Sequence, residues 1–193
     1  MSISFKAVRQ HGVSLVELVM FIVIVSIAVL GVLQVLGSSS ARSADPMLRK
    51  QALSIAEGLM EEVRLAHFSY CDGADPTAES ATVLSPSDCA VAEAVGPEAG
   101  NSRPYDNVND YVAAFGTPAA YNTDAAGNAF PAGYAATVTI SVDSAFGPAG
   151  AQISAGATPA SMNVLRISVA VSYPGGGLVV LDGYRTRYAP RSI

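Results

Sequence analysis

Residue types that could perform catalysis are scarce in this chain of 193 residues. The only histidines are His11, which precedes a long apolar run, and His67. A single histidine beyond that run leaves no plausible Ser/His/Asp or Cys/His set. The stretches GPAG and PGGG lack the lysine and the strand-to-helix context of a phosphate-binding loop, so we interpret them as turns. We therefore expect a protein that is not an enzyme and that uses no cofactor.

Two cysteines could form a covalent link. Cys71 and Cys89 lie in a polar segment that follows the apolar run. If this segment is exported to an oxidising compartment, a disulfide is the natural expectation, and closing a loop of this size contributes about 3 kcal/mol to stability. The alternative is a pair of free thiols. A zinc site would need further ligands, and only His67 is near.

Two oxygen-rich stretches raise the question of a calcium site. YDNVNDY and YNTDAAGN offer carboxylate and amide oxygens at Asp106, Asn107, Asn109, Asp110, Asn122, Asp124 and Asn128. Neither stretch matches the ligand spacing of an EF-hand loop. Asp and Asn serve far more often in turns and helix caps, so we predict capping roles for them and no metal site.

Glu17 is the acidic residue that most needs an explanation. Residues 18–36 carry no charge, and as a helix they would span about 28 Å, close to the hydrocarbon thickness of a bilayer. An acid at the edge of such a segment is costly and usually has a function. A secretory signal peptide cut after Ser43 or Ala44 would have a shorter apolar core than this run. An uncleaved signal anchor fits the length but gives Glu17 no role.

The junction before Glu17 resembles that of the type IV prepilin family, which includes pilins and the pseudopilins of type II secretion. Residues 1–12 form a short leader that contains a lysine and an arginine and ends in Gly12, and Glu17 is the fifth residue after that glycine. In the family, a membrane peptidase cuts after this glycine and the new N-terminal residue is N-methylated. The resemblance thus implies cleavage between Gly12 and Val13, N-methylation of Val13 and an assembly role for Glu17.

Cleavage would give Glu17 a partner. It creates a positive α-amine on Val13, and the Glu17 carboxylate follows one helical turn later, where a helix N-terminus favours an acid. In an assembled filament, the resemblance implies that the carboxylate instead meets the amine of a neighbouring subunit, so that the pair sets the register. Two residues depart from the family pattern, because Val13 replaces the usual phenylalanine and Ser14 the common threonine.

The distribution of charge excludes one class of partner. The chain has a formal net charge of -5. Arg103 is the only basic residue between His67 and Leu165, in a stretch with acidic residues throughout. Such a surface repels phosphate backbones, so we expect no binding to nucleic acid. The ordinary role of such charges is to form a solvated face that keeps a domain soluble.

The elements that position these residues fall into five segments. We expect a cleaved basic leader over residues 1–12, a hydrophobic transmembrane and assembly helix over 13–40, its amphipathic continuation over 41–66, an acidic disulfide-containing loop region over 67–132 and an antiparallel sheet over 133–193. Glycine and serine at 37–40 should weaken the helix. Asp45-Pro46 is typical of an N-cap followed by proline at the first helical position, which predicts a restart at Met47.

The region after Met47 shows two different periods. Apolar residues first recur at steps of three or four, which predicts a helix with one apolar stripe: Leu48, Ala52, Ile55, Leu59, Val63 and Ala66. TVTISV and VLRISVAVSY then alternate as strands do, YPGGG is a turn, and LVVLDGYRTRY returns as the partner strand. The expected fold class is α+β: a pilin-like long N-terminal helix, transmembrane in its first half, packed against a C-terminal antiparallel sheet of at least three strands.

The order of the later motifs narrows the resemblance to the minor pilins of mannose-sensitive haemagglutinin (MSHA) pili. These motifs are SADPMLRKQALSIAEGLMEEV, the cysteine pair, YDNVNDY and VSYPGGGLVVLDGYRTRY. The partners implied are a prepilin peptidase/methyltransferase, the inner-membrane pilus assembly machinery, the membrane and other pilin subunits. The precursor would cross the inner membrane once with a periplasmic C-terminal domain, and the mature subunit would reach the pilus at the cell surface. The alternatives are a type II secretion pseudopilin and a membrane-anchored binding or adhesin domain that never polymerises.

Overall fold

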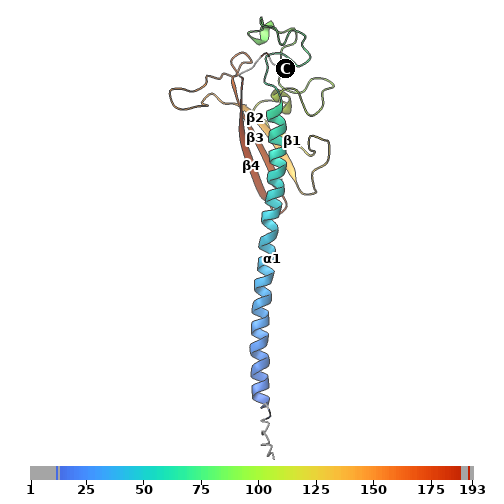
Figure 1. Ribbon diagram of the computed structural model, residues 1–193, viewed down its shortest axis with the longest axis vertical. Coiled ribbons are helices and arrows are strands. Elements are labelled where there is room, and N and C mark those ends of the chain that lie inside the picture. The colour runs from blue at the N-terminus through green and yellow to red at the C-terminus, as the bar shows by residue number, and fades with distance from the viewer. Residues whose placement is uncertain (1–11, 13, 188–190, 192–193) are drawn as a thin grey trace, which may run out of the picture. The chain divides into compact units, whose positions relative to one another are not determined.

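The computed structural model describes residues 12, 14–187 and 191, and for residues 37–45 it describes the backbone alone. Residues 1–11 of the predicted leader and Val13 lie outside the described residues. The elements follow in the order α1 (Leu15–Leu65), η1 (Pro86–Asp88), η2 (Val108–Tyr111), β1 (Ala119–Tyr121), β2 (Ala135–Val142), β3 (Val164–Tyr173) and β4 (Gly177–Thr186) (Figure 1). The chain divides into two compact units, the first ending at Pro46 and the second beginning at Met47.

Helix α1 continues through the point where the sequence predicted a restart. Its 51 residues include Pro46 in the interior of the helix, so the prediction of an N-cap at Asp45 is wrong. A proline costs a helix interior about 3 kcal/mol because it removes one hydrogen bond, whereas propagation on either side adds one hydrogen bond per residue. The helical segments on both sides outweigh the interruption, although the boundary between the two compact units still falls at Pro46.

The second unit contains a four-stranded antiparallel sheet in the order β1-β2-β3-β4. The predicted alternation is confirmed, because in β3 Leu165 and Ile167 are fully buried whereas Arg166 between them in sequence is exposed. The predicted turn joins β3 to β4. Gly175 and Gly176 in this turn have φ angles of 92° and 79°, a conformation that glycine adopts without strain.

Strand β1 is an element that the sequence did not predict. It has three residues in the region expected to form loops, and it pairs with β2 so that Ala120 lies opposite Thr137. A segment of three residues, two of them alanine, is too short to show a period of two. The segment is therefore a strand because it pairs with β2, and the pattern of its own residues does not indicate one.

The part of α1 within the second unit packs against the sheet. Figure 1 shows β2, β3 and β4 alongside this part of the helix, and both elements contribute to one hydrophobic core. Ala52, Leu59 and Val63 of the predicted apolar stripe are buried, and Ala56 joins them. The stripe thus packs on its own domain, as one apolar face of an amphipathic helix does.

The loop region between α1 and β1 is held by a disulfide. Cys71 and Cys89 are bonded to each other, with their Cα atoms 5.4 Å apart, and Val83 packs against them in a second, smaller core. Asp75 accepts a hydrogen bond from the Val91 amide at 2.8 Å, which lowers the pKa of that carboxyl. Because both sulfur atoms are bonded to each other, neither is available as a metal ligand.

Candidate membrane and assembly site

The predicted site begins at the N-terminus of α1. Ser14 caps the helix, because its carbonyl accepts from the Leu18 amide at 3.1 Å and its Oγ accepts from the Glu17 amide at 3.5 Å. Glu17 is therefore in the first turn, where the helix dipole favours an acid. Gly12 lies two residues before the cap and is exposed, whereas Val13 lies outside the described residues.

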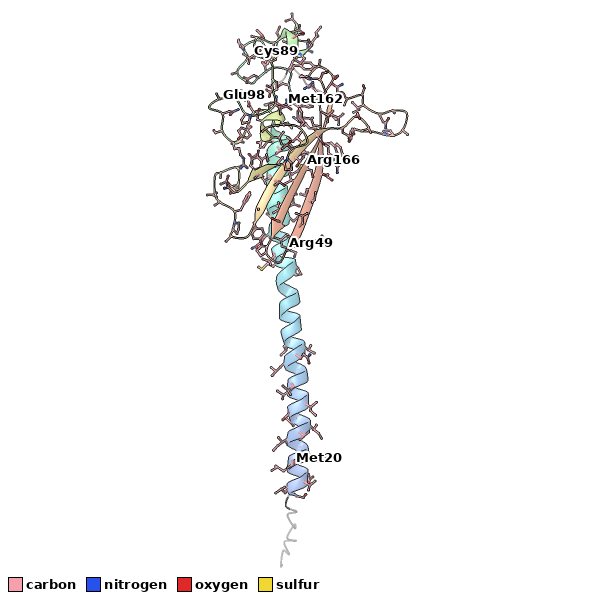
Figure 2. All side chains as sticks on the ribbon, turned by 180° about the vertical axis from the view of Figure 1, so that it is seen from behind. Met20, Arg49, Cys89, Glu98, Met162 and Arg166 are labelled. Atoms are coloured by element: carbon pink, nitrogen blue, oxygen red, sulfur yellow. A yellow bond between two sulfur atoms is a disulfide. The ribbon has the colours of Figure 1, made fainter. Side chains whose placement is uncertain are left out.

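The helix that follows Ser14 has a continuous apolar surface. Every residue of Leu15–Leu36 is exposed, including Phe21 and Ile27 at 64% and 66%, and Figure 2 shows Met20 projecting away from the helix. These 22 residues cover about 33 Å, so the helix is long and apolar enough to cross a membrane. An exposed apolar surface of this extent marks contact with lipid or with other protein chains.

The polar side chains Ser26 and Glu17 of this segment differ in whether they have a partner within the helix. Ser26 donates from Oγ to the carbonyl of Ile22 at 2.7 Å, so its hydroxyl needs no partner outside the helix. Glu17 is the only charged residue of the segment, and within the part of the chain that the structure describes no cation forms an ion pair with it. A carboxylate at one end of an apolar helix can bind an amine supplied by a processed N-terminus or by another chain.

The second unit fastens its loops to α1 through a buried ion pair. Arg103 donates from Nε and Nη2 to the two carboxylate oxygens of Glu62 at 2.9 and 2.6 Å, and from Nη1 to the Thr123 carbonyl at 2.9 Å. Tyr111 adds a hydrogen bond to Glu62 at 3.1 Å. Burial raises the pKa of this tyrosine, and the Glu62 charge raises it further. The sequence marked Arg103 as an isolated base, but nothing in it indicated Glu62 as the partner.

Two of the oxygen-rich residues have the capping roles that the sequence predicted. Oδ1 of Asp124 accepts from the Asn128 amide at 2.8 Å, and the Asn128 side chain holds the pKa of Asp124 below its usual value. Asn107 caps η2 by accepting from the Asn109 amide at 3.4 Å. Asp110 is a third, because its Oδ2 accepts from the Asn107 amide at 3.2 Å, but its Oδ1 is buried and has no hydrogen-bond partner among the described residues.

Comparisons with models of protein families, with curated proteins and with solved structures found no match to this chain. Its function is therefore inferred from its residues and their geometry. The structure defines an α+β protein in which an N-terminal helix, long and apolar enough to cross a membrane, precedes a unit with a four-stranded antiparallel sheet and a disulfide.

Proposed function

We propose that this chain is the precursor of a minor pilin in a type IV, MSHA-like pilus, and that it is most similar to the D-type minor pilin of that system. A prepilin peptidase removes residues 1–12, and Val13 becomes the N-methylated N-terminus. The apolar helix then holds the subunit first in the inner membrane and later in the fibre. The observation that carries the proposal is Glu17 in the first turn of an exposed apolar helix, four residues after Val13.

The surroundings of Gly12 support cleavage at this position. A Cβ built on Gly12 would meet no atom within 4 Å, so no contact in the described fold requires glycine there. A requirement for glycine would then come from an outside factor. A peptidase whose active site must approach the backbone closely is such a factor, because only glycine lacks a Cβ.

The assembly role of Glu17 follows from its position at the end of an apolar helix. Removal of the leader supplies a positive amine on Val13, and in a fibre the amine of a neighbouring subunit neutralises the Glu17 carboxylate. An acid left without a partner among apolar helices is strongly penalised. Subunits that dock out of register would leave it unpaired, so the pair selects one register.

The disulfide supports export of the second unit. Bonds such as Cys71–Cys89 persist in oxidising compartments, of which the bacterial periplasm is one, and are rare in the cytosol. A precursor with its apolar helix in the inner membrane and its second unit in the periplasm meets this condition. The partners are then the peptidase/methyltransferase, the assembly machinery and the other pilin subunits.

Replacing Glu17 by alanine tests the assembly role in cells that contain the pilus machinery. We expect the amount of subunit in sheared fibres to fall at least about tenfold, which corresponds to about 1.4 kcal/mol of lost docking energy, while the amount in the membrane stays the same. Glu57→Ala is the matched control, because Glu57 is an exposed acid on the same helix. Immunoblots of fibre and membrane fractions measure both.

The outcome also separates the alternatives. Unchanged incorporation of Glu17→Ala would refute the assembly role, and a wild-type chain that stays in the membrane fraction would indicate an anchored binding or adhesin domain. Incorporation that depends on the type II secretion machinery, and not on the pilus machinery, would identify a pseudopilin.

A further inference from the structure

Five acidic side chains converge in the loop region of the second unit: Asp72, Glu93, Glu98, Asp106 and Asp110. Ligand oxygens of the first three lie within 4.8 Å of one another, and so do those of the last three. Glu98, labelled in Figure 2, belongs to both sets. Two oxygens that each lie about 2.4 Å from one calcium ion are at most about 4.8 Å apart. Each set is therefore compact enough to share an ion.

Backbone hydrogen bonds hold the segments that carry these acids. The Asp72 amide donates to the Val91 carbonyl at 3.1 Å, and the Glu93 amide donates to the Tyr70 carbonyl at 2.9 Å. The Gly96 amide donates to a carbonyl of η2 at 3.2 Å, which ties the segment between Glu93 and Glu98 to the helix that contains Asp110. The acids are thus brought together by the backbone and do not depend on chance contacts of mobile side chains.

Two of the five acids have a buried oxygen atom without a partner. Glu93 and Asp110 are only 7% and 2% exposed, and neither Oε1 of Glu93 nor Oδ1 of Asp110 finds a hydrogen-bond partner in the described part of the chain. The other oxygen of Asp110 accepts from the Asn107 amide at 3.2 Å. An unsatisfied buried oxygen costs about 1–3 kcal/mol. Each set contains one of these two oxygens, so a cation bound in a set would satisfy the oxygen there.

The described residues supply no cation that pairs with the cluster. The Asn101 side chain donates to Oε2 of Glu98 at 3.2 Å and to Oδ1 of Asp106 at 3.0 Å, but it is neutral. The Arg187 charge is felt at Glu93, yet its guanidinium lies 4.2 Å over the Phe68 ring and forms no ion pair with any of the five acids in the described residues. Arg187 therefore offsets part of the charge near Glu93, but no ion pair among the described residues neutralises any of the five acids.

Electrostatics give the same picture of the cluster. Burial raises the pKa of Glu93 to about 9, and the charges of Asp110, Glu98, Asp106 and Asp72 add to this effect. Burial, followed by the charge of Glu98, raises the pKa of Asp110 to about 7. The negative charges of these acids therefore act on one another, as the short distances within the two sets require.

Gly73 shows how closely the cluster is built. A Cβ on this residue would collide with Oδ2 of Asp106. Glycine directly after Asp72 therefore lets the Asp106 carboxylate approach the loop that carries Asp72, and any side chain at this position would displace one of the five acids.

We propose that the two sets of carboxylates that share Glu98 bind calcium in the loop region. All the donors are carboxylate oxygens, and calcium accepts 6–8 oxygens in irregular geometry. Magnesium demands a near-ideal octahedron and keeps several waters, and zinc prefers nitrogen and sulfur. An ion in the first set would connect residue 72 to the segment 93–98, and an ion in the second would connect residue 98 to the segment 106–110. This site does not depend on whether the chain assembles into a fibre.

The full-length chain in detergent micelles provides the test. After removal of metals with a chelator, calorimetric titration with calcium chloride should give saturable binding, and the melting temperature of the second unit should rise by about 5 °C or more at saturation. Binding should be weaker in an equal titration with magnesium chloride.

Glu98→Gln removes one ligand that belongs to both sets, and Glu79→Gln, at an exposed acid in the same loop region, is the matched control. We expect the first change to weaken calcium binding at least tenfold and the second to leave it unchanged. In the absence of calcium, Glu98→Gln should not lower the melting temperature, since it relieves repulsion between like charges. The proposal is overturned if the wild-type chain gives neither heat nor a melting shift, if magnesium binds as tightly, or if Glu98→Gln keeps the wild-type affinity.

Discussion

Glu62 on α1 and Arg103, 41 residues later in the chain, form a two-bonded ion pair with donor–acceptor distances of 2.9 and 2.6 Å. Their side chains are 4% and 13% exposed, respectively. The pair joins the loop region to the helix on which the sheet packs. It also explains why the one basic residue of an acidic stretch is retained inside the unit, because a buried carboxylate requires a positive partner.

Removing the positive partner should strongly destabilise the second unit. Arg103→Met leaves the Glu62 carboxylate buried and uncompensated, so we expect the free energy of unfolding to fall by about 3–5 kcal/mol. Urea unfolding of the full-length chain in micelles, followed by the near-ultraviolet dichroism of its tyrosines, measures this, since the chain has no tryptophan. Arg166→Met is the control. Its ion pair with Asp182 is 2.8 Å long but exposed, so the loss should stay below about 1 kcal/mol. Equal losses in the two variants would contradict the role of the buried pair.

Reduction of the disulfide should loosen the loop region. Cys71 and Cys89 are separated by 18 residues, and opening a loop of this size removes about 3 kcal/mol of stability. The double variant Cys71→Ser, Cys89→Ser should therefore melt at a lower temperature than the wild type, and a reducing agent should lower the melting temperature of the wild type alone. Mass spectrometry after alkylation without a reductant should find no modified cysteine. Labelling of both cysteines would show that the bond is absent.

The protein freed of metal should lose stability as the pH rises through the neutral range. The pKa of Glu93 is raised from its ordinary value of 4.5 to about 9, and that of Asp110 from 3.8 to about 7. At a pH between the ordinary and the raised pKa of each carboxyl, the folded state binds more protons than the unfolded state. The stabilising effect is therefore complete below about pH 4 and is lost as the pH rises through the folded values. Melting temperatures in chelator between about pH 5 and pH 9 should fall accordingly.

A variant identifies the group responsible for this slope. Glu93→Gln cannot titrate, so its melting temperature should change less with pH than that of the wild type, whereas Glu79→Gln should keep the full dependence because Glu79 is exposed. The other charges that act on Glu93 come from Asp110, Glu98, Asp106, Asp72 and Arg187. If the melting temperature of Glu93→Gln changed with pH as much as that of the wild type, the pH dependence would come from another of these groups and not from Glu93.

The elements with a repeated local pattern could be predicted from the sequence. In β3 the residues from Leu165 to Val171 alternate between fully buried and more exposed, as for Ile167 and Arg166, so the period of two is visible. The helical stripe with Leu59 and Val63 is visible for the same reason. The apolar segment Leu15–Leu36 could be predicted from its length and composition alone. Each of these signals lies within one element and does not depend on distant residues.

The features that the sequence did not reveal depend on residues far apart in the chain or on competition between local rules. Strand β1 exists through its pairing with β2, and the charges of Asp72 and Asp110 act on Glu93 only after the loop region has folded. The preference of Asp for caps and turns correctly predicted the role of Asp124. The same preference gave no sign that Oδ1 of Asp110 would be buried without a hydrogen-bond partner. At Pro46, the local preference for a helix start was weaker than propagation from both sides.

The mass of the mature protein tests the central claim most directly. For protein purified from cells that contain the prepilin peptidase, mass spectrometry should find a chain that lacks residues 1–12 and begins with Val13 carrying one additional methyl group. Gly12→Val serves as the control. It should remain uncleaved and keep its fold, because a Cβ at this position meets no atom within 4 Å. A wild-type protein that retains Met1 in those cells would contradict the assignment as a type IV prepilin.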